Sequence, residues 1–299
     1  MNDAPSDGAI LLQAQDRGCV FDFPDAAADA VLQACTRIIE AGQGSKTELA
    51  TARASRGLAY LSKDDPDDAE LDAKEALALD PDLALAHYSR GSVYMHKHVA
   101  EAAMAELGTA IKLDPNVVNF YDNRASLEIG MARYDEAISD LSQAIALKPD
   151  QWIPYHNRRI VLQMANRYAD AVLDADKVKQ LAPDSAANWN NACWARAIWG
   201  QELETALADC DKALAMVPAN ATSLHSRCFV KFRMKRYDGA AADCAAAIKA
   251  DPQHFSSLYI HGLAVMRSGQ RSEGSHEVDM VKQVIPNIED IYARYGVKP

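Results

Sequence analysis

Apolar and polar positions along the chain repeat with the period of amphipathic helices, and the helical segments come in pairs. Within a segment, large apolar residues recur at i, i+3, i+4 and i+7, which places them on one face of a helix. A small residue recurs at one place in the segments, as at Ala69, Ala103 and Ala137, and lets two antiparallel helices approach closely. Short polar turns such as residues 63–65 and 235–237 separate the helices of a pair. The pattern predicts an all-α chain of helix pairs.

Prolines mark the period of this pattern. They are Pro81, Pro115, Pro149, Pro183, Pro218, Pro252 and Pro286, and the intervals between their numbers are 34, 34, 34, 35, 34 and 34. Each follows the end of a predicted helix, where a proline cannot continue the helix. A helix pair of this length buries its apolar face only against its neighbours, so such a chain grows along one axis without a single large core. The fifth unit carries one extra residue near residues 200–202.

Two segments, RGLAY…DDAELDAKEALALDP and NRASLEIGMARYDEAISDLSQAIALKP, resemble tetratricopeptide repeats, and seven such units agree in phase over residues 50–286. The resemblance implies an all-α solenoid, a right-handed superhelix in which the first helix of each pair lines the inner surface. Residues 1–49 are predicted to form a degenerate N-terminal repeat or cap, with its second-type helix at residues 25–41. Residues 287–299 are predicted to form a C-terminal capping helix. Phrases such as NNACWARA also resemble exported α-proteobacterial repeat proteins.

Charge and hydropathy narrow the class of partner and the compartment. The net charge of −11 repels phosphate backbones and argues against a nucleic-acid partner. No stretch approaches the roughly 18 apolar residues of a membrane span. The N-terminus, MNDAPSDGAILLQAQ, lacks the basic start and long apolar run of a secretory signal. We therefore expect a cytoplasmic protein, or a periplasmic one if the N-terminus is truncated.

An arginine on the first helix of a unit is matched, at a constant interval of 16 in the numbering, by an acidic residue on the second helix. These pairs are Arg56 with Asp72, Arg90 with Glu106, Arg124 with Asp140, Arg158 with Asp174, and Arg227 with Asp243. The seventh unit has the weaker pair of His261 and Glu277, and the fifth has Asp209 but Ala192 in place of the arginine. We interpret these pairs as structural ion pairs between the two helices.

The six cysteines form three pairs at equivalent places in their units: Cys19 and Cys35, Cys193 and Cys210, and Cys228 and Cys244. The intervals within the pairs are 16, 17 and 16, and the longer interval falls in the unit with the extra residue. Because the two places are filled together, the pattern favours disulfides. The alternative is that each cysteine is a small buried apolar residue, which suits a cytoplasmic protein better.

Motifs of catalysis and metal binding are missing from the sequence. It holds no Gly-rich phosphate loop, no His-Glu-x-x-His and no G-x-S-x-G. His96 and His98 flank a turn with no further ligand nearby, and the cysteines show no Cys-x-x-Cys pair. We therefore expect no enzyme, no catalytic residues, no metal site and no cofactor.

The resemblance places a set of asparagines and apolar residues on the inner surface. Asn123, Asn157 and Asn191 recur at the interval of one repeat, so they should stack as a ladder on three successive first helices. An asparagine amide can pair with both the C=O and the N–H of a peptide. The apolar residues predicted to contact a peptide with them are Tyr88, Ile160, Trp194, Phe229 and Tyr259. Alternatively, asparagine is simply common beside the arginine, and the superhelix curls enough to shelter the apolar residues.

The function predicted from these features is a non-catalytic scaffold that binds a protein or an extended peptide in its groove. Two alternatives remain at this stage: a structural assembly subunit that acts through its outer face or ends, and a receptor for a small signalling peptide. Chaperone C-terminal carboxylate tails are not expected to bind. The family members that bind such tails use lysine and asparagine together on first helices, whereas the corresponding places here hold Ala54 and Leu58, Tyr88 and Ser92, and Asp122 and Ser126.

Overall fold

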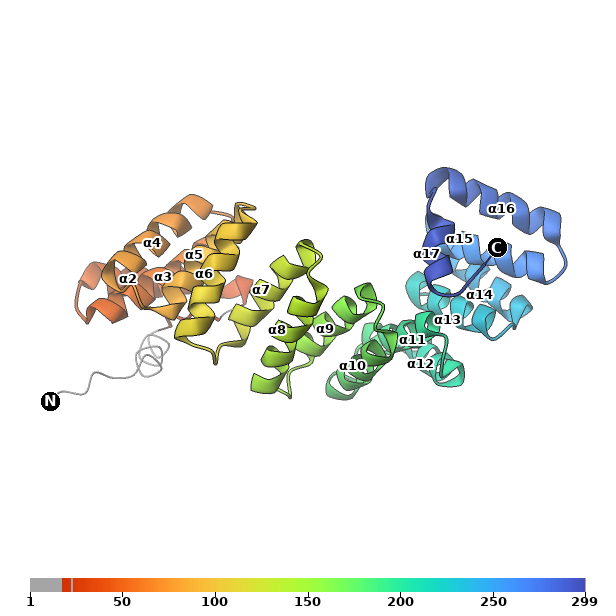
Figure 1. Ribbon diagram of the computed structural model, residues 1–299, viewed down its shortest axis with the longest axis horizontal. Helices are drawn as coiled ribbons and strands as arrows, with labels where there is room; N and C mark the ends of the chain where they lie inside the picture. The colour runs from red at the N-terminus through yellow and green to blue at the C-terminus, as the bar shows by residue number, and fades with distance from the viewer. Residues whose placement is uncertain (1–17, 23, 299) are drawn as a thin grey trace. The chain divides into compact units, whose positions relative to one another are not determined.

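The structure is a computed structural model of the chain, and it describes residues 18–22 and 24–298. Over these residues the secondary structure consists of helices joined by turns, with no strand among them. The N-terminal segment considered as a secretory signal lies outside the described residues. The prediction of an all-α chain of consecutive helix pairs is confirmed (Figure 1).

The chain divides into two compact units, Met1–Pro149 and Asp150–Pro299. Helices of the first unit are η1 (Asp25–Ala27), α2 (Ala28–Ala41), α3 (Lys46–Ser62), α4 (Pro66–Leu79), α5 (Ala84–His96), α6 (Ala100–Leu113), α7 (Val118–Gly130) and α8 (Tyr134–Leu147). In this unit α3 pairs with α4, α5 with α6, and α7 with α8, and α2 packs on α3.

In the second unit, the three helix pairs that follow α9 (Trp152–Met164) and α10 (Tyr168–Leu181) position the candidate site. The other helices of this unit are α11 (Ala186–Trp199), α12 (Leu203–Met216), α13 (Ala221–Arg233), α14 (Tyr237–Ala250), α15 (Phe255–Arg267), α16 (Arg271–Val284) and α17 (Ile288–Arg294). The pairs α11–α12, α13–α14 and α15–α16 follow one another, and the first helices α11, α13 and α15 lie next to each other. We call the surface that these three first helices form the first-helix face.

Helix starts and turns follow from local sequence. Ser45 begins α3 with a capping box, in which its hydroxyl accepts a hydrogen bond from the Glu48 N–H at 3.1 Å and the Glu48 carboxylate accepts from the Ser45 N–H at 2.7 Å. Pro66 stands at the start of α4, where its missing N–H costs nothing. The tight turns of six pairs place a non-glycine residue in the left-handed region: Asp64, His98, Ala132, Asn166, Glu202 and Lys235.

The small residues lie where the helices of a pair are closest. Ala69, Ala103 and Ala137 are fully buried. In the last pair both helices use glycine, and a Cβ on Gly262 would lie 2.7 Å from the Gly274 carbonyl oxygen. Any larger residue there would push α15 and α16 apart.

The predicted ion pairs are confirmed in all units for which the sequence offers both partners. Arg56 Nε lies 2.7 Å from Asp72 Oδ2, and a second nitrogen, Nη2, lies 2.8 Å from Oδ1, so the contact is bidentate. The pairs of Arg90 with Glu106, Arg124 with Asp140, Arg158 with Asp174, and Arg227 with Asp243 have contacts of 2.6–2.7 Å, and His261 lies 2.7 Å from Glu277. Each pair joins the first helix of a unit to its second helix.

No described helix is both long enough and apolar enough to cross a membrane.

Candidate functional site

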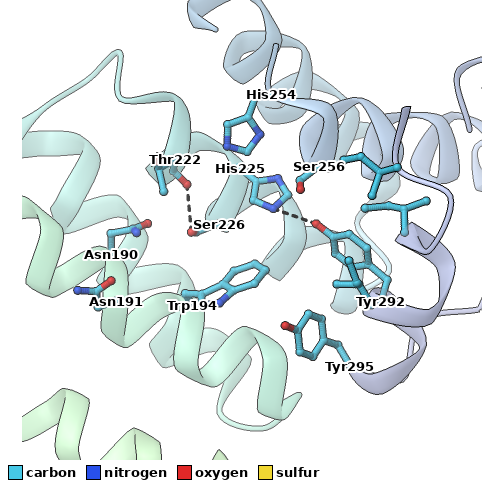
Figure 2. A pocket seen from close by; sticks show the side chains of 13 residues that line it. Asn190, Asn191, Trp194, Thr222, His225, Ser226, His254, Ser256, Tyr292 and Tyr295 are labelled. Atoms are coloured by element: carbon cyan, nitrogen blue, oxygen red, sulfur yellow. Dashed lines mark hydrogen bonds between the residues drawn. The ribbon is translucent and has the colours of Figure 1, made fainter. Parts of the chain in front are cut away.

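A cavity of about 350 Å³ opens on the first-helix face of the second unit. Its walls come from α11, from α13, from the start of α15, and from the end of the chain, which returns to this face after α16 (Figure 2). The thirteen lining residues are Asn190, Asn191, Trp194, Thr222, His225, Ser226, His254, Ser256, Ile285, Ile288, Ile291, Tyr292 and Tyr295.

The cavity is lined by neutral side chains. None of the thirteen residues carries a carboxylate, an ammonium or a guanidinium group. Figure 2 shows the amides of Asn190 and Asn191 and the hydroxyls of Thr222 and Ser226 on one side of the cavity, and Ser256, Tyr292 and Tyr295 on the other. Trp194 stands between the two sides. Such a lining combines apolar contact with uncharged hydrogen-bonding groups, which suits a neutral part of a ligand.

Asn190 and Asn191 bring two neighbouring amides from α11 to the cavity. Asn190 is 8% exposed, and its Oδ1 has no hydrogen-bond partner in the described structure. A buried acceptor without a partner is costly, and a ligand N–H would satisfy it. Asn191 is half-buried beside it, one turn of α11 before Trp194.

His225 forms the centre of a buried hydrogen-bonded chain. Its Nδ1 lies 3.1 Å from the Ser257 hydroxyl, and its Nε2 lies 3.2 Å from the Tyr292 hydroxyl (Figure 2). The Ser257 hydroxyl also lies 2.9 Å from His254 Nδ1. Burial lowers the pKa of His225 to about 3, with a smaller contribution from His254, so the imidazole is neutral at physiological pH.

An aromatic cluster fills the space beside the histidine. The Tyr292 ring stacks on Tyr259 with centroids 5.1 Å apart and meets Phe229 edge-on at 5.4 Å. Trp194 lies 5.4 Å from Phe229 and 5.9 Å from Tyr295. Pairs of this geometry add to the free energy gained from burial alone.

Two of the residues predicted from the sequence to contact a peptide line the cavity. Asn191 and Trp194 stand on its α11 wall. The assignment of Phe229 and Tyr259 to the exposed inner surface needs correction, because both are 0% exposed. Both belong to first helices, as expected, but the returning end of the chain covers them. They pack against the lining residues: Phe229 contacts Trp194 and Tyr292, and Tyr259 contacts Tyr292.

The remaining predicted contact residues lie away from this cavity. Tyr88, in the first unit, is 7% exposed, packs on Phe120 at 4.8 Å, and accepts a hydrogen bond from Asn123 Nδ2 at 3.1 Å. In the second unit, α9 carries Asn157, which is half-buried, and Ile160, which is 38% exposed. The Asn123 amide thus has a hydrogen-bond partner within its own unit.

The sequence reasoning missed the contribution of α17. We expected residues 287–299 to cap the end of the solenoid, yet Ile288, Ile291, Tyr292 and Tyr295 form a wall of the cavity. Their spacing of three and four positions was the signal in the sequence, because it places all four on one side of a helix. A helix this short with one apolar and aromatic side is stable only when that side packs against another surface.

The cysteines lie in the core and not in the cavity. The structure joins Cys19 to Cys35, Cys193 to Cys210, and Cys228 to Cys244, with Cα atoms 4.9, 5.3 and 5.3 Å apart. The second and third bonds tie α11 to α12 and α13 to α14. They therefore fix two of the helices that form the first-helix face.

Within residues 18–22 and 24–298, no group of three or more His, Cys, Asp or Glu side chains is arranged to hold a metal ion.

Comparisons with known proteins identify the repeat. The tetratricopeptide repeat family matches residues 118–151, which contain α7 and α8. A search of the curated proteins finds no match. The solved structures that resemble the chain include a tetratricopeptide repeat protein from Parabacteroides merdae, with a TM-score of 0.60, 14% identity, and coverage of 83% of this chain and 99% of that one.

Two further structures resemble large parts of the chain. The Pseudomonas aeruginosa pilF protein has a TM-score of 0.57 and 21% identity over 71% of this chain and 96% of its own. YrrB, described as a TPR protein with an unusual peptide-binding site, has a TM-score of 0.56 and 16% identity over 62% of this chain and 96% of its own. At these identities the likeness shows the fold alone.

Proposed function

Because the chain is a tetratricopeptide-repeat protein, we propose that it is a non-catalytic scaffold that binds a segment of another polypeptide on the first-helix face of its second unit. The observation that carries this proposal is the neutral cavity in which Asn190 and Asn191 stand beside Trp194. The amides match the N–H and C=O groups of a peptide backbone. The Trp194 indole offers apolar contact to one of its side chains.

The chemistry of the cavity also favours some partners over others. A nucleic acid would need cationic groups for its phosphates, and a C-terminal carboxylate tail would need a lysine or arginine. The cavity lining supplies neither, and the net charge of the chain is −11. We therefore propose an internal, uncharged stretch of polypeptide as the ligand. YrrB, a protein of similar fold, has a peptide-binding site, which agrees with a peptide ligand here.

The alternative function is that of a structural subunit, which assembles with other proteins through its outer face. The large apolar residues exposed on second helices include Leu71 on α4 and Leu173 on α10, which are 53% and 68% exposed. Single exposed residues of this kind are ordinary on a protein surface. The exposed leucines are therefore weaker support for outer-face assembly than the cavity is for peptide binding.

Site-specific photo-crosslinking tests the proposal while the partner is still unidentified. The photoreactive residue p-benzoylphenylalanine is placed at position 191, in the cavity, or at position 173, on the exposed side of α10. In extract of the native cell, we expect one or a few polypeptides to crosslink at position 191 and not at position 173. The reverse pattern would favour outer-face assembly, and equal labelling at both positions would contradict a specific site.

A further inference from the structure

The end of the chain lies on the first-helix face as a bound peptide would. We call residues 288–298 the return segment. Ile288 and Tyr292 are each 2% exposed and Val297 is 4% exposed, so the segment is packed closely against this face. The Tyr292 ring packs on Tyr259 and Phe229, from α15 and α13. The segment therefore covers two of the residues that the resemblance to tetratricopeptide repeats assigns to the inner surface.

Two arginines of the first helices hold the backbone of the return segment. Arg233, at the end of α13, donates a hydrogen bond from Nη1 to the Tyr295 carbonyl oxygen. Arg267, at the end of α15, donates from Nη2 to the Lys298 carbonyl oxygen at 3.0 Å. Carbonyl groups are present in every polypeptide, so these contacts do not depend on the side chains of the segment. They are contacts that a foreign segment can make equally well.

One contact does depend on the side chain. The Tyr292 hydroxyl meets His225 Nε2 at 3.2 Å, while the other ring nitrogen is engaged by Ser257. His225 is 5% exposed and belongs to a chain of buried polar groups. A phenylalanine in this place would fill the same space but leave His225 Nε2 without a partner. Sites that hydrogen-bond a hydroxyl reject an analogue that lacks it, so the first-helix face is built to select a tyrosine.

The return segment is also separable from the helices that receive it. Its helix, α17, has 7 residues, which is too short to be stable without the surface on which it docks. The receiving helices have other supports, because disulfides tie α11 to α12 and α13 to α14. A short helix with no disulfide to its neighbours opens more readily than core helices that disulfides tie in pairs, so the segment can leave while the solenoid stays folded.

We propose that the return segment is an internal ligand, and that the partner binds by displacing it with a short segment of its own that places a tyrosine against His225. This inference rests on the proposed function and specifies its ligand. The partner segment is amphipathic and uncharged on its docking side. It carries an apolar residue four positions before the tyrosine and an aromatic residue three positions after it, as Ile288 and Tyr295 stand relative to Tyr292.

Peptide titration against a cleavable form of the full chain tests this inference. A specific protease site is inserted between Pro286 and Asn287, the protein is folded intact, and the segment is then cut and removed by dialysis. The probes are a fluorescent peptide of residues 287–298 and the same peptide with Tyr292→Phe. We expect the cut protein to bind the tyrosine peptide, to bind the phenylalanine peptide about tenfold more weakly, and the uncut protein to bind neither. Equal binding of both peptides, or equal binding to cut and uncut protein, would overturn the proposal.

Hydrogen exchange of the intact, unmodified chain gives a second readout that does not depend on removal of the segment. Amides of residues 288–298 are expected to exchange at least about tenfold faster than the central amides of α13 and α15, because the segment opens alone. Exchange at the same rate as α13 and α15 would make the segment part of the core and would overturn the proposal. Neither experiment uses an outside partner, so failure of the crosslinking test leaves both readouts interpretable.

Discussion

Arg196 Nη1 donates a hydrogen bond to Asp209 Oδ2 at 3.1 Å. Arg196 thus supplies the cation for Asp209 that position 192, an alanine in this repeat, does not supply. Arg196 stands one helical turn further along α11. From there its guanidinium also reaches Asp176 at 2.7 Å and Glu202 at 2.9 Å. Glu202 precedes α12 in the turn that carries the extra residue of this repeat. The altered turn and the displaced arginine therefore form one local adaptation.

Removal of this arginine should be more destabilising than removal of an arginine from an exposed ion pair. Arg196 is 4% exposed, and Arg196→Ala leaves Asp209 buried with only Lys179, at 2.8 Å, as its remaining cation. Loss of one partner of a buried pair costs about 3–5 kcal/mol, and Lys179 should keep the loss at about 3 kcal/mol. Urea unfolding followed by circular dichroism measures it. The control is Arg167→Ala, because the Arg167 side chain is 48% exposed and its partner Asp170 is 47% exposed. An equal or larger loss in the control would contradict the role assigned to Arg196.

The three disulfides should be present in the native protein and should each stabilise it. Each closes a loop with a sequence separation of 16 or 17, which corresponds to about 3 kcal/mol in the chain-entropy model. Thiol titration of the unreduced, denatured protein should therefore find no free thiol, and a reducing agent should lower the unfolding midpoint. Six free thiols in protein from its native source would instead support the alternative of small buried apolar residues.

The turn between α7 and α8 offers a stabilising substitution. Ala132 has φ 57°, in the left-handed region that disfavours residues with a Cβ. Ala132→Gly should raise the free energy of unfolding by about 0.5–1 kcal/mol, because glycine adopts this conformation without the steric cost. The control is Ala105→Gly in the middle of α6, which should lower it by about 1 kcal/mol. If both substitutions destabilise the protein to the same extent, the strain assigned to Ala132 is absent.

Glu128 should make stability fall as pH rises toward neutrality. The residue is 5% exposed, and burial raises its pKa from 4.5 to about 7, with Asp140 adding to the rise and Arg124 opposing it. The folded state thus keeps a proton that the unfolded state has lost, so this stability is full below pH 4.5 and disappears as pH rises through 7. The expected change is up to roughly 3 kcal/mol.

Glu128→Gln should remove this dependence and make the protein more stable than the parent at pH 8, since an amide has no charge to desolvate. Urea unfolding between pH 5 and 8 shows the difference. Glu101→Gln is the control, because the Glu101 side chain is 83% exposed. If Glu128→Gln and Glu101→Gln follow the same pH profile, Glu128 is ionised in the folded protein at little cost.

The local features of the fold could be predicted from the sequence because they repeat. The small residues at Ala69 and Ala103, and ion pairs such as Arg56 with Asp72, recur at one period and join helices that are neighbours in the chain. The role of Arg196 was missed because it lies one helical turn after position 192, where the repeat pattern places the arginine. Its partners could be identified only after the extra residue of the fifth repeat had been placed.

The candidate site could be predicted only in part, for a related reason. Asn191 and Trp194 were identified from their place on a first helix, and both line the cavity. The opposite wall depends on a contact between Tyr292 and His225, which are 67 residues apart in a part of the chain that does not repeat. Periodicity carries no information about such a contact. The same contact explains why Phe229 is core and not exposed surface.

The measurement that tests peptide binding at the first-helix face most directly is calorimetry with the peptide identified by crosslinking at position 191. The parent protein, Trp194→Ala and Leu173→Ala are titrated under the same conditions, after circular dichroism has shown equal helix content. We predict that Trp194→Ala weakens binding at least about tenfold, since it removes the main apolar wall of the cavity, and that Leu173→Ala leaves the dissociation constant unchanged. Unchanged affinity for Trp194→Ala, or a larger loss for Leu173→Ala, would place the binding surface elsewhere and contradict the proposed function.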